Sequence, residues 1–557
     1  MSRWDAEAIR LGMPEEVLME NAARCAMDCL RRHWSTRGRT LCGASVLLLA
    51  GSGNNGGDAF CMARHLLDAG ACPVLICTRA PENYRGAAAH WLRVAMELGV
   101  PVFSSDLWEQ GHHAIPSRPA IAVDGLLGTG FKGELREREA RLVQKFNALG
   151  ADLVLAVDIP SGLDARTGRP CPEAVRAHVT VTFQASKPGL LLPQAEAFTG
   201  TLEIRPIGMP RRVQEAFPPS FRTWLPSAQH SGDRAAPYIL EHRYSAKTKH
   251  WMDTALSGMA SRPATQGPAH KGEAGRVLIL GGCADYTGAP CLAGRASLRT
   301  GAGLVTVAGP DAVLDAVRSS MPSLTTQRLS LLPGAPAPDW TAEAVQALLP
   351  VLSASKTSFR AVVFGPGLGR SEGAADFAEA LLALPQRPPL VLDADALFVL
   401  ARRPALLSRL TPDDILTPHP GEAAAMLGLT TAEVQADRFA ALEKLTALAP
   451  SVWVLKGAGT LIAVPGEPSV ISPWDVPQLA VAGSGDVLAG AIGALLARGL
   501  SSGLSAVLGV WLHILAGLRL SESFPMRGNE PQDIADALPA AMAILGLPQK
   551  SEPCPLF

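Results

Sequence analysis

The sequence of 557 residues predicts an α/β protein with two large domains. Its apolar segments are continuous rather than alternating, which is typical of parallel strands covered by helices on both faces of a sheet. The 53 glycines and 45 prolines beside only 5% aromatic residues fit many tight turns between strands and helices. At about 150 residues per domain, the length allows two or three domains.

The strands recur in order along both halves of the chain. In the first half, residues 46–50 form an apolar segment that stops at glycines and precedes a helical pattern at residues 58–67, and further strands are expected at 73–77, 120–123, 153–157 and 179–183. In the second half, strands are expected at 277–280, 304–308, 361–364, 390–392 and 452–455. Each half is therefore predicted to form its own α/β domain.

The predicted domains span residues 1–213 and 268–548. The intervening residues 214–267 are rich in proline and turn-forming residues, which predicts a linker in which 238–259 could form a short helix. Residues 549–557 are predicted to be a frayed tail.

Charge and hydropathy exclude several classes of protein. Lys and Arg number 50 against 51 Asp and Glu, and no stretch accumulates basic residues, so nucleic acid is not an expected partner. The apolar runs at 487–497 and 504–518 are shorter than the roughly 20 residues needed to cross a bilayer, so no membrane span is expected. Asp5 and Glu7 stand where a secretory signal would be apolar, which favours a cytoplasmic protein. The ten cysteines form no C-x-x-C pair and are expected to be buried free thiols.

The first motif is the glycine-rich segment Gly51-Ser-Gly-Asn-Asn-Gly56, which matches G-x-G-x-x-G between a strand and a helix. Such a loop can bring backbone N–H groups to a phosphate, although a plain turn would look the same. A redox dinucleotide fold would place an acid at the end of the next strand, where this chain has Thr78 and Arg79.

Polar residues also end the later strands of the first half. Because parallel strands end at one edge of the sheet, we expect Asn55, Asp124, Asp158 and Ser161 to converge there. Amide, carboxylate and hydroxyl oxygens are the ligands of a hard cation rather than of zinc. Each Asp taken singly could equally be a turn former or a helix cap.

Four motifs in this order resemble the NAD(P)H-hydrate epimerase domain, which is Rossmann-like with three α/β/α layers. They are Leu18-Met-Glu-Asn-Ala22, Asn54-Asn-Gly-Gly-Asp58, Asp124-Gly-Leu-Leu-Gly-Thr-Gly-Phe131 and Asp158-Ile-Pro-Ser-Gly162. The resemblance covers about residues 1–213. It implies that Asn55, Asp124 and Ser161 bind K⁺ and that Asp124 is the catalytic acid/base. It also implies hydrate contacts by Asn54, Asn55, Gly56, Gly57, Asp58, Gly128, Thr129, Gly130, Phe131, Lys132, Gly133, Glu134 and Asp158.

In the second half, the segment Ala482-Gly-Ser-Gly-Asp486 stands directly before a helical run at 487–498. Small residues and a helix N-terminus offer N–H groups to an anion, and a carboxylate stands beside them. This combination suits phosphoryl transfer with Asp486 as the base for the attacking hydroxyl. The alternative is a glycine turn in which Asp486 only caps the helix.

Other loops of the second half also follow apolar strands and should meet at the same sheet edge. They are residues 364–369, 391–396, 416–422 and 455–460. Lys456 could neutralise nucleotide phosphates. His419, between two prolines at a strand end, is either structural or a substrate contact.

These loops are similar to the ribokinase-like fold, and more closely to its ADP-dependent NAD(P)H-hydrate dehydratase branch, over about residues 268–548. The matching segments include His270-Lys-Gly272, Gly365-Pro-Gly-Leu-Gly369, Asp393-Ala-Asp395, Thr417-Pro-His-Pro-Gly-Glu422 and Gly483-Ser-Gly-Asp486. The resemblance implies that Ala289, Gly367, His419 and Asp486 face the hydrate. It implies adenine-nucleotide contacts by Lys456, Gly457, Ala458, Gly459, Thr460 and Gly485, with Mg²⁺ beside the nucleotide. The chain departs from the family at Phe398, where Asn is common, and at residues 474–481.

Together the two resemblances imply a bifunctional repair enzyme for hydrated NADH and NADPH (NADHX and NADPHX). The first domain would interconvert the R and S epimers, and the second would use ADP or ATP to dehydrate the S epimer, giving NAD(P)H, AMP and phosphate when ADP is used. A homo-oligomer is expected. The alternatives are a ribokinase-like kinase for a sugar or vitamin, and a non-catalytic nucleotide-binding scaffold.

Overall fold

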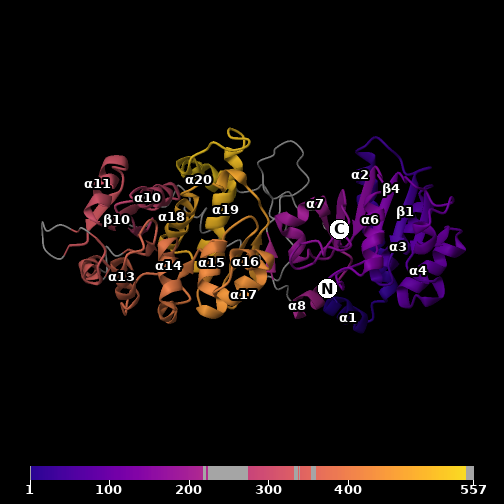
Figure 1. Cartoon of the computed structure of the whole chain (residues 1–557), viewed down its shortest axis with the longest axis horizontal. Helices are drawn as coiled ribbons and strands as arrows, with labels where there is room; N and C mark the ends of the chain where they lie inside the picture. Colours follow the sequence, from indigo (N-terminus) through magenta and orange to yellow (C-terminus); the bar gives the residue numbers. More distant parts are fainter. Residues whose placement is uncertain are drawn as a thin grey trace, which may run out of the picture. The chain divides into compact units, whose positions relative to one another are not determined.

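The computed structural model describes residues 2–217, 221–223, 274–330, 337, 339–352 and 359–546, and divides into two compact units, Met1–Pro219 and Ser220–Phe557 (Figure 1). Residues 224–267 of the expected linker, with the short helix expected at 238–259, lie outside the described residues, as do the tail 549–557 and the segment 270–272.

The linker prediction is wrong at its described end. Residues 214–216 belong to helix α8 (Arg211–Ala216), and residues 221–223 form strand β8 (Phe221–Thr223) of the second unit. Strand β8 pairs in parallel with β17 (Ser469–Ser472) and thereby covers the open hydrogen-bonding edge of that strand.

The first unit is built on a seven-stranded sheet in the order β3-β2-β1-β4-β5-β6-β7, in which every pairing is parallel. The strands are β1 (Ser45–Ala50), β2 (Cys72–Cys77), β3 (Val102–Ser104), β4 (Ile121–Gly125), β5 (Leu153–Val157), β6 (Val179–Phe183) and β7 (Thr201–Arg205). The helices are α1 (Ser2–Arg10), α2 (Glu15–Ser35), α3 (Asn54–Asp68), α4 (Gly86–Glu97), α5 (Ser105–Glu109), α6 (Glu137–Asn147), α7 (Glu196–Thr199) and α8. The strand order reverses between β1 and β4, and ligands bind at such a point in open α/β sheets.

Alternate residues of β1 show why this unit has three layers. Val46 and Leu48 are buried in the core that α2, α3 and α4 complete on one face of the sheet. Leu47 and Leu49 point to the other face and are buried with residues of α5 and α6. The prediction of a Rossmann-like α/β/α domain is confirmed.

The second unit is built on a ten-stranded sheet in the order β11-β10-β9-β12-β13-β14-β15-β16-β17-β8. The strands other than β8 and β17 are β9 (Arg276–Leu280), β10 (Leu304–Gly309), β11 (Thr325–Arg328), β12 (Ala361–Phe364), β13 (Leu390–Leu392), β14 (Ile415–Leu416), β15 (Val452–Leu455) and β16 (Thr460–Ala463). Strands β11 to β15 are parallel, and β16 is antiparallel to both of its neighbours. The predicted parallel α/β core of the second domain is therefore confirmed.

Helices surround this sheet and form its main core. They are α10 (Gly288–Arg299), α11 (Asp311–Ser320), α12 (Leu349–Leu352), α13 (Glu372–Leu382), α14 (Asp395–Arg402), α15 (Pro420–Leu427), α16 (Thr431–Ala436), α17 (Arg438–Leu448), α18 (Ser484–Ala497), α19 (Ser502–Leu520) and α20 (Pro531–Gly546). Helix α18 packs against β9, β12 and β13, and α19 packs against α18. By length and composition α19 could cross a membrane, but 83% of its apolar window is buried inside the unit, as in a core helix.

The nine described cysteines are all free thiols, as predicted, but most are not buried. Cys29, Cys61 and Cys77 are buried, whereas Cys42 and Cys72 are exposed and the others are intermediate. Cys42 precedes β1 and Cys72 begins β2. Both lie at the amino ends of these strands, whereas the glycine motif follows the carboxyl end of β1. Exposure there follows from their position at the rim of the unit.

Candidate functional site

The glycine motif of the first unit forms a close turn between β1 and α3. A Cβ atom on Gly51 would lie 1.7 Å from the carbonyl oxygen of Leu126, and one on Gly56 would lie 2.0 Å from the carbonyl oxygen of Gly51. Only glycine fits at these two positions, because neighbouring backbone fills the space of a side chain. The turn starts α3 at Asn54, so residues 54–58 occupy its first turns.

The structure brings Asn55, Asp124 and Ser161 into one cluster at the ends of α3, β4 and β5. The Ser161 hydroxyl donates to Oδ1 of Asp124 at 2.6 Å, and the Ser161 N–H donates to Oδ2 at 2.7 Å. The Asn55 side-chain amide donates to the carbonyl oxygens of Leu127 at 2.9 Å and Val157 at 2.7 Å. The predicted convergence of these three residues is therefore confirmed.

Asp124 is fully buried, and within the described part of the chain no Lys or Arg side chain pairs with it. Burial raises its pKa to about 6, against the lowering effect of the hydrogen bonds from Ser161. This buried site therefore contains three oxygen ligands, which are the Asp124 carboxylate, the Ser161 hydroxyl and the Leu127 carbonyl. No positive charge among the described side chains compensates them. This donor set fits a hard monovalent or divalent cation.

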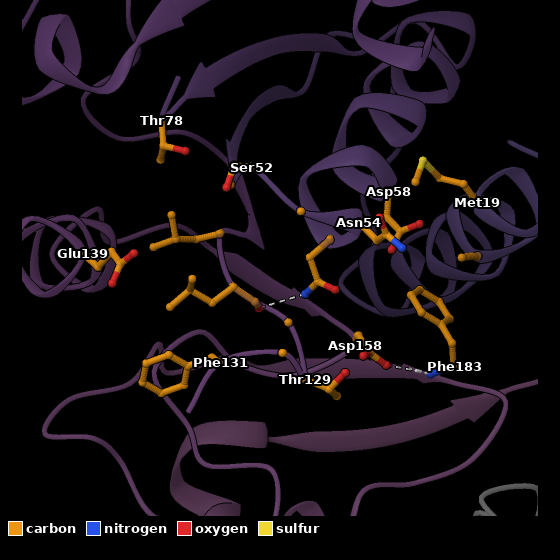
Figure 2. Close-up of a pocket in the computed structure, with 18 of the residues that line it drawn as sticks. Met19, Ser52, Asn54, Asp58, Thr78, Thr129, Phe131, Glu139, Asp158 and Phe183 are labelled. Atoms are coloured by element: carbon orange, nitrogen blue, oxygen red, sulfur yellow. Dashed lines mark hydrogen bonds between the residues drawn. The ribbon is translucent and has the colours of Figure 1, made fainter. Parts of the chain in front are cut away.

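A cavity of about 820 Å³ lies beside this cluster, at the carboxyl ends of the strands (Figure 2). Ten of the residues predicted to contact the hydrate line it: Asn54, Asn55, Asp58, Gly128, Thr129, Gly130, Phe131, Lys132, Glu134 and Asp158. Gly56, Gly57 and Gly133 do not line it. Gly56 and Gly57 are buried, and Gly57 faces the side chain of Met19.

Asp124 and Ser161 are not among the residues that line the cavity, so the role of Asp124 as acid/base stays a prediction. Asp124 lies inside β4, paired with Leu49 and Ala156, rather than beyond the end of the strand. Both of its carboxylate oxygens already accept hydrogen bonds. A group so placed organises the loops around it.

Asp158 is the carboxylate that enters the cavity, and it has a partner that the motifs did not reveal. Lys187, 5% exposed, forms a buried ion pair with Asp158 and donates to Oγ1 of Thr182 at 2.7 Å. The Phe183 N–H donates to the same Asp158 oxygen at 3.2 Å (Figure 2). Asp158 itself has a φ of 65°, a left-handed conformation that is uncommon for non-glycine residues. The sequence signal for Lys187 was its place just after β6, the next strand of the sheet.

Asp58 faces the same end of the cavity as Asp158 (Figure 2). Burial raises its pKa well above the ordinary value, and the nearby charge of Asp158 raises it further. Asp58 therefore favours its protonated form, and Asp158 beside it is paired with the Lys187 ammonium.

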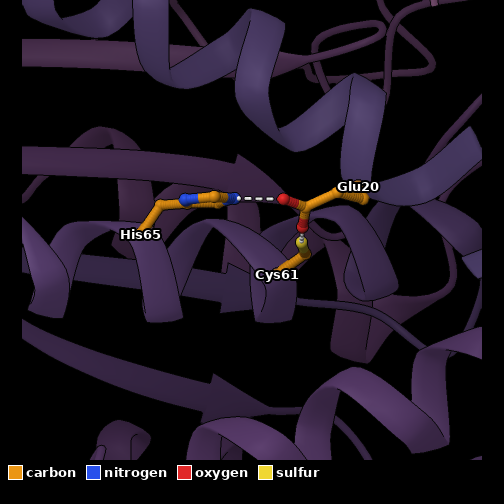
Figure 3. A group of neighbouring side chains, drawn as sticks. All are labelled: Glu20, Cys61 and His65. Atoms are coloured by element: carbon orange, nitrogen blue, oxygen red, sulfur yellow. Dashed lines mark hydrogen bonds and ion pairs between the residues drawn. The ribbon is translucent and has the colours of Figure 1, made fainter. Parts of the chain in front are cut away.

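Glu20 of the first predicted motif forms a separate cluster with Cys61 and His65 (Figure 3). The Cys61 thiol and the His65 ring lie 3.0 and 3.1 Å from its two carboxylate oxygens. These donor types can bind a metal, but Nη2 of Arg64 lies 2.9 and 2.8 Å from the same oxygens and compensates the charge. We interpret the cluster as structural: its hydrogen bonds hold α2 against α3, the helix that carries Asn54 to Asp58.

In the second unit, Lys456 and three loops meet at the carboxyl ends of the strands. Nζ of Lys456 lies 2.5 Å from Oδ1 of Asp393 and 3.9 Å from Glu422. The Thr417 hydroxyl donates to the same Asp393 oxygen at 2.7 Å. A Cβ atom on Gly485 would lie 3.3 Å from Nζ of Lys456. The predicted meeting of the loops that carry these residues is confirmed.

Asp486 lies in the first turn of α18, next to this group. Burial, and then the charge of the Asp393 carboxylate, raise its pKa to about 8 against the lowering effect of Lys456. The helix begins at Ser484 after Gly483, whose φ of 88° requires the left-handed conformation. No side-chain hydrogen bond caps the N-terminus of this helix. The alternative, in which Asp486 only caps the helix, is therefore not supported.

His419 caps α15 and stands at the edge of the group. Its Nδ1 accepts hydrogen bonds from the N–H groups of Gly421 and Glu422 at 3.0 and 3.2 Å, and its Nε2 lies 3.4 Å from Oε1 of Glu422. Burial and the charge of Lys456 lower its pKa, so the ring is neutral. On another loop, a Cβ atom on Gly367 would lie 3.1 Å from Cβ of Ala289, so these two predicted contacts are neighbours.

Arg438 is a buried residue of α17 that the motifs did not identify, and it holds the predicted nucleotide loop at residues 456–460. Its Nη2 donates to the carbonyl oxygens of Leu455, Lys456 and Gly459 at 3.1 to 3.2 Å. One guanidinium therefore fixes the backbone on both sides of Gly457, whose φ is 128°. The sequence contains no pattern that marks Arg438, because it lies on α17, away from the loop in sequence.

The departures at Phe398 and Trp474 have structural counterparts. The guanidinium carbon of Arg370 lies 4.4 Å from the centre of the Phe398 ring, and Nε of Arg370 pairs with Asp395 at 3.0 Å. The carbonyl oxygen of Trp474 accepts a hydrogen bond from the N–H of Gly459. The Phe398 side chain therefore packs beside Arg370, and the backbone of Trp474 contacts the predicted nucleotide loop.

Comparisons with known proteins match both units. Residues 15–189 match the family described as YjeF-related protein N-terminus, and residues 277–540 match the family described as NAD(P)H-hydrate dehydratase. Similar proteins include the bifunctional NAD(P)H-hydrate repair enzymes Nnr of Moorella thermoacetica and Coxiella burnetii. The first is 35% identical over 95% of this chain and 92% of its own, and the second is 33% identical over 95% of each.

Among solved structures, the ADP/ATP-dependent NAD(P)H-hydrate dehydratase of Bacillus subtilis, co-crystallised with ATP and Mg²⁺, is 26% identical. The match covers 53% of this chain and 98% of that one, with a TM-score of 0.42. The relatives from Moorella and Coxiella extend over both units and nearly the whole of each chain. The chain therefore belongs to the family of bifunctional NAD(P)H-hydrate repair enzymes.

Proposed function

We propose that this protein repairs hydrated NADH and NADPH. Its first unit interconverts the R and S epimers, and its second unit dehydrates the S epimer with ADP. The observation that carries the proposal is the placement of Asp486, a half-buried carboxylate with a raised pKa at the N-terminus of α18, beside Lys456 and Gly485. A base beside a set of free helix N–H groups is what transfer of a phosphoryl group to a hydroxyl needs.

The hydrate carries a hydroxyl on C6 of the reduced nicotinamide ring, and hydroxide is a poor leaving group. Asp486 takes the proton of this hydroxyl as its oxygen attacks the β-phosphorus of ADP, and AMP departs. Phosphate then leaves C6, a proton leaves C5, and the ring double bond is restored. The N–H groups at residues 483–486 would hold the migrating phosphoryl group.

The adenine nucleotide is proposed to lie along residues 456–460, with Lys456 and Gly485 against its phosphates. Arg438 fixes this loop from behind. Burial and the charge of Asp393 raise the pKa of Glu422 to about 7, because the two carboxylates repel one another. A Mg²⁺ ion with the nucleotide would fit among Asp393, Glu422 and Asp486, and would supply charge neutralisation.

In the first unit, C6 becomes planar when an acid protonates its hydroxyl, the C6–O bond breaks with loss of water, and the N1 lone pair forms an iminium bond. Water then adds to the other face of C6 and returns its proton to the same group. Asp58, held in its protonated form by burial, is our proposal for that group. Asp158, paired with Lys187, would orient the hydroxyl. The K⁺ ion would be held by Asn55, Asp124 and Ser161 behind the loop that follows β4, and it would supply positive charge to that buried site.

The test is incubation of the purified protein with ADP, Mg²⁺ and a mixture of R and S NADH hydrates. Absorbance at ~340 nm, which only the restored ring gives, is expected to recover for both epimers, and AMP and phosphate should form in equal amounts. Recovery of the S epimer alone would contradict the epimerase. Absence of any recovery would contradict the dehydratase, and transfer of phosphate from ATP to a sugar or vitamin would support the kinase alternative.

A further inference from the structure

The cavity of the first unit has two ends of opposite charge. Asp58 and Asp158 lie at one end, and the charges of Asp5 and Glu15 act on Asp58 there. Four cations line the rest of the cavity. Arg79 comes from the loop after β2, Lys132 and Arg136 from the segment between β4 and α6, and Arg138 from the first turn of α6. Two acids, Glu134 and Glu139, accompany these four cations, so this part of the lining is net basic.

The sheet order sets the distance between the two ends. Arg79 follows β2, whereas Asp158 follows β5, and strands β1 and β4 lie between them. Three strand spacings of about 4.8 Å separate the two strands by roughly 14 Å. A ligand that reaches both ends must therefore be extended, as a dinucleotide is.

The basic end of the cavity, on the β2 side of β1, offers hydrogen-bond donors as well as charge. Thr78 is opposite the glycine turn, since its N–H donates to the carbonyl oxygen of Ala50 at 3.2 Å, and Ser52 lies in that turn. Figure 2 shows the hydroxyls of Thr78 and Ser52 at this end, away from Asp58 and Asp158. Both residues line the cavity together with Arg79.

Arg79 has its charge available, unlike Arg138 on the same part of the lining. Among the described residues, no carboxylate forms an ion pair with Arg79, and the residue is exposed. Arg138, in contrast, is paired with Asp106 at 2.6 Å. Glu139, the acid labelled at this end in Figure 2, already accepts a hydrogen bond from the Arg136 N–H at 3.1 Å as a helix cap.

We propose that Ser52, Thr78 and Arg79 form a subsite for the 2′-phosphate of NADPHX in the epimerase unit. In dinucleotide folds of this strand order, an acid after the second strand binds the ribose 2′-hydroxyl, and an Arg nearby accommodates a 2′-phosphate. This chain has Thr78 and Arg79 at that position. The acidic end of the cavity then receives the hydrated ring. The inference rests on the proposed epimerase function and adds that this unit favours NADPHX over NADHX.

The experiment measures epimerisation of R-NADPHX and R-NADHX separately, by chromatography of the epimers, in the full-length protein without ADP. Loss of a charge-assisted contact to phosphate in Arg79→Ala should raise the KM for NADPHX about 10- to 100-fold and leave the KM for NADHX within about twofold. Arg79→Glu should go further and reverse the preference, because its carboxylate repels a phosphate but accepts a hydrogen bond from a 2′-hydroxyl. Arg93→Ala, an exposed arginine of α4 outside the cavity lining, is the matched control.

The outcomes separate this inference from the function on which it rests. If the wild type epimerises neither hydrate, the proposed function of this unit fails. If the wild type is active and Arg79→Ala raises both KM values equally, Arg79 contacts the pyrophosphate common to both substrates, and the 2′-phosphate subsite is refuted. Unchanged KM values for both hydrates in Arg79→Ala would refute it as well.

Discussion

Nζ of Lys456 lies 2.5 Å from Oδ1 of Asp393, and this pair links the strand that precedes the nucleotide loop to the loop after β13. Lys456 also attracts Glu422 and Asp486, so one cation faces three acids in a buried place. Burial raises the pKa values of Glu422 and Asp486, and the net negative charge of the group raises them as well. This electrostatic arrangement keeps the pKa of a proton acceptor near neutral pH, where a catalytic base works best.

The Asp486→Asn variant should lose dehydratase activity by at least about 100-fold, because an amide cannot take the proton of the C6 hydroxyl. Binding of ADP should change by less than about threefold, since the helix N–H groups and Lys456 remain. Epimerisation by the other unit serves as the internal control for folding. A variant that still dehydrates S-NADHX at a rate near that of the wild type would remove Asp486 from the role of base.

The dehydratase should become faster as the pH rises toward 8. Asp486 must be ionised to accept a proton, and its pKa is raised to about 8, so the active form is a minority at pH 6.5. We expect kcat/KM for S-NADHX to rise nearly tenfold per pH unit below 8 and to level off above it. Initial rates from pH 6.5 to 9 at saturating ADP and Mg²⁺ measure this. A profile that is flat or falls over that range would show that Asp486 titrates elsewhere or is not the base.

Asp58→Asn should stop interconversion of the epimers while dehydration of pure S-NADHX continues. We expect a loss of about 100-fold or more, the usual contribution of a positioned proton donor. Because the raised pKa of Asp58 favours the acid form, epimerisation by the wild type should also decline as pH rises, in the opposite direction to dehydration. Exchange of R and S NADHX, followed by chromatography, measures both effects, and wild-type exchange in the variant would assign the proton transfer to another group.

The sequence allowed prediction of those parts of the site that depend only on strand order. Asn55, Asp124 and Ser161 meet because β4 is flanked by β1 and β5 and all three strands run in parallel. The sequence did not show how far inside the end of its strand each residue lies. Asp124 was therefore predicted to be catalytic although it lies inside β4, whereas Asp58 and Asp158 line the cavity and are better placed for that role. Lys187 belongs to no motif, and only the folded sheet brings it to Asp158.

The missed strands at the edges of the sheets share a physical cause, whereas β16 and β17, also missed, lie inside their sheet. Strands β3 and β8 have three residues each, and β7 carries Glu203 and Arg205 on a half-buried edge. Short edge strands bury too little apolar surface to leave a hydrophobic pattern, and their pairing is decided by the sheet beside them. The central strands, which are buried on both faces, were predicted because their apolar runs are uninterrupted.

Potassium should stabilise the first unit through Asp124. Its folded-state pKa of about 6 lies above the ordinary value of 3.8, so the charged form is disfavoured by folding. Stability should therefore fall as pH rises from about 4 to 6, and above pH 6 the cost is about 3 kcal/mol at 1.36 kcal/mol per pKa unit. A cation bound to Asp124 offsets part of this cost, and each kcal/mol recovered should raise the midpoint of thermal inactivation by about 2 to 4 °C.

Residual epimerase activity after heating, at equal ionic strength in KCl or choline chloride, measures the effect in the unit that holds Asp124. At pH 8 the midpoint should be several degrees higher in KCl, whereas at pH 5, where most of the Asp124 carboxyl is protonated, the difference should shrink. Asp124→Asn should abolish the difference, because the neutral amide leaves no charge to compensate. Equal midpoints in the two salts at pH 8, or a potassium effect that persists in Asp124→Asn, would show that Asp124 does not hold the ion.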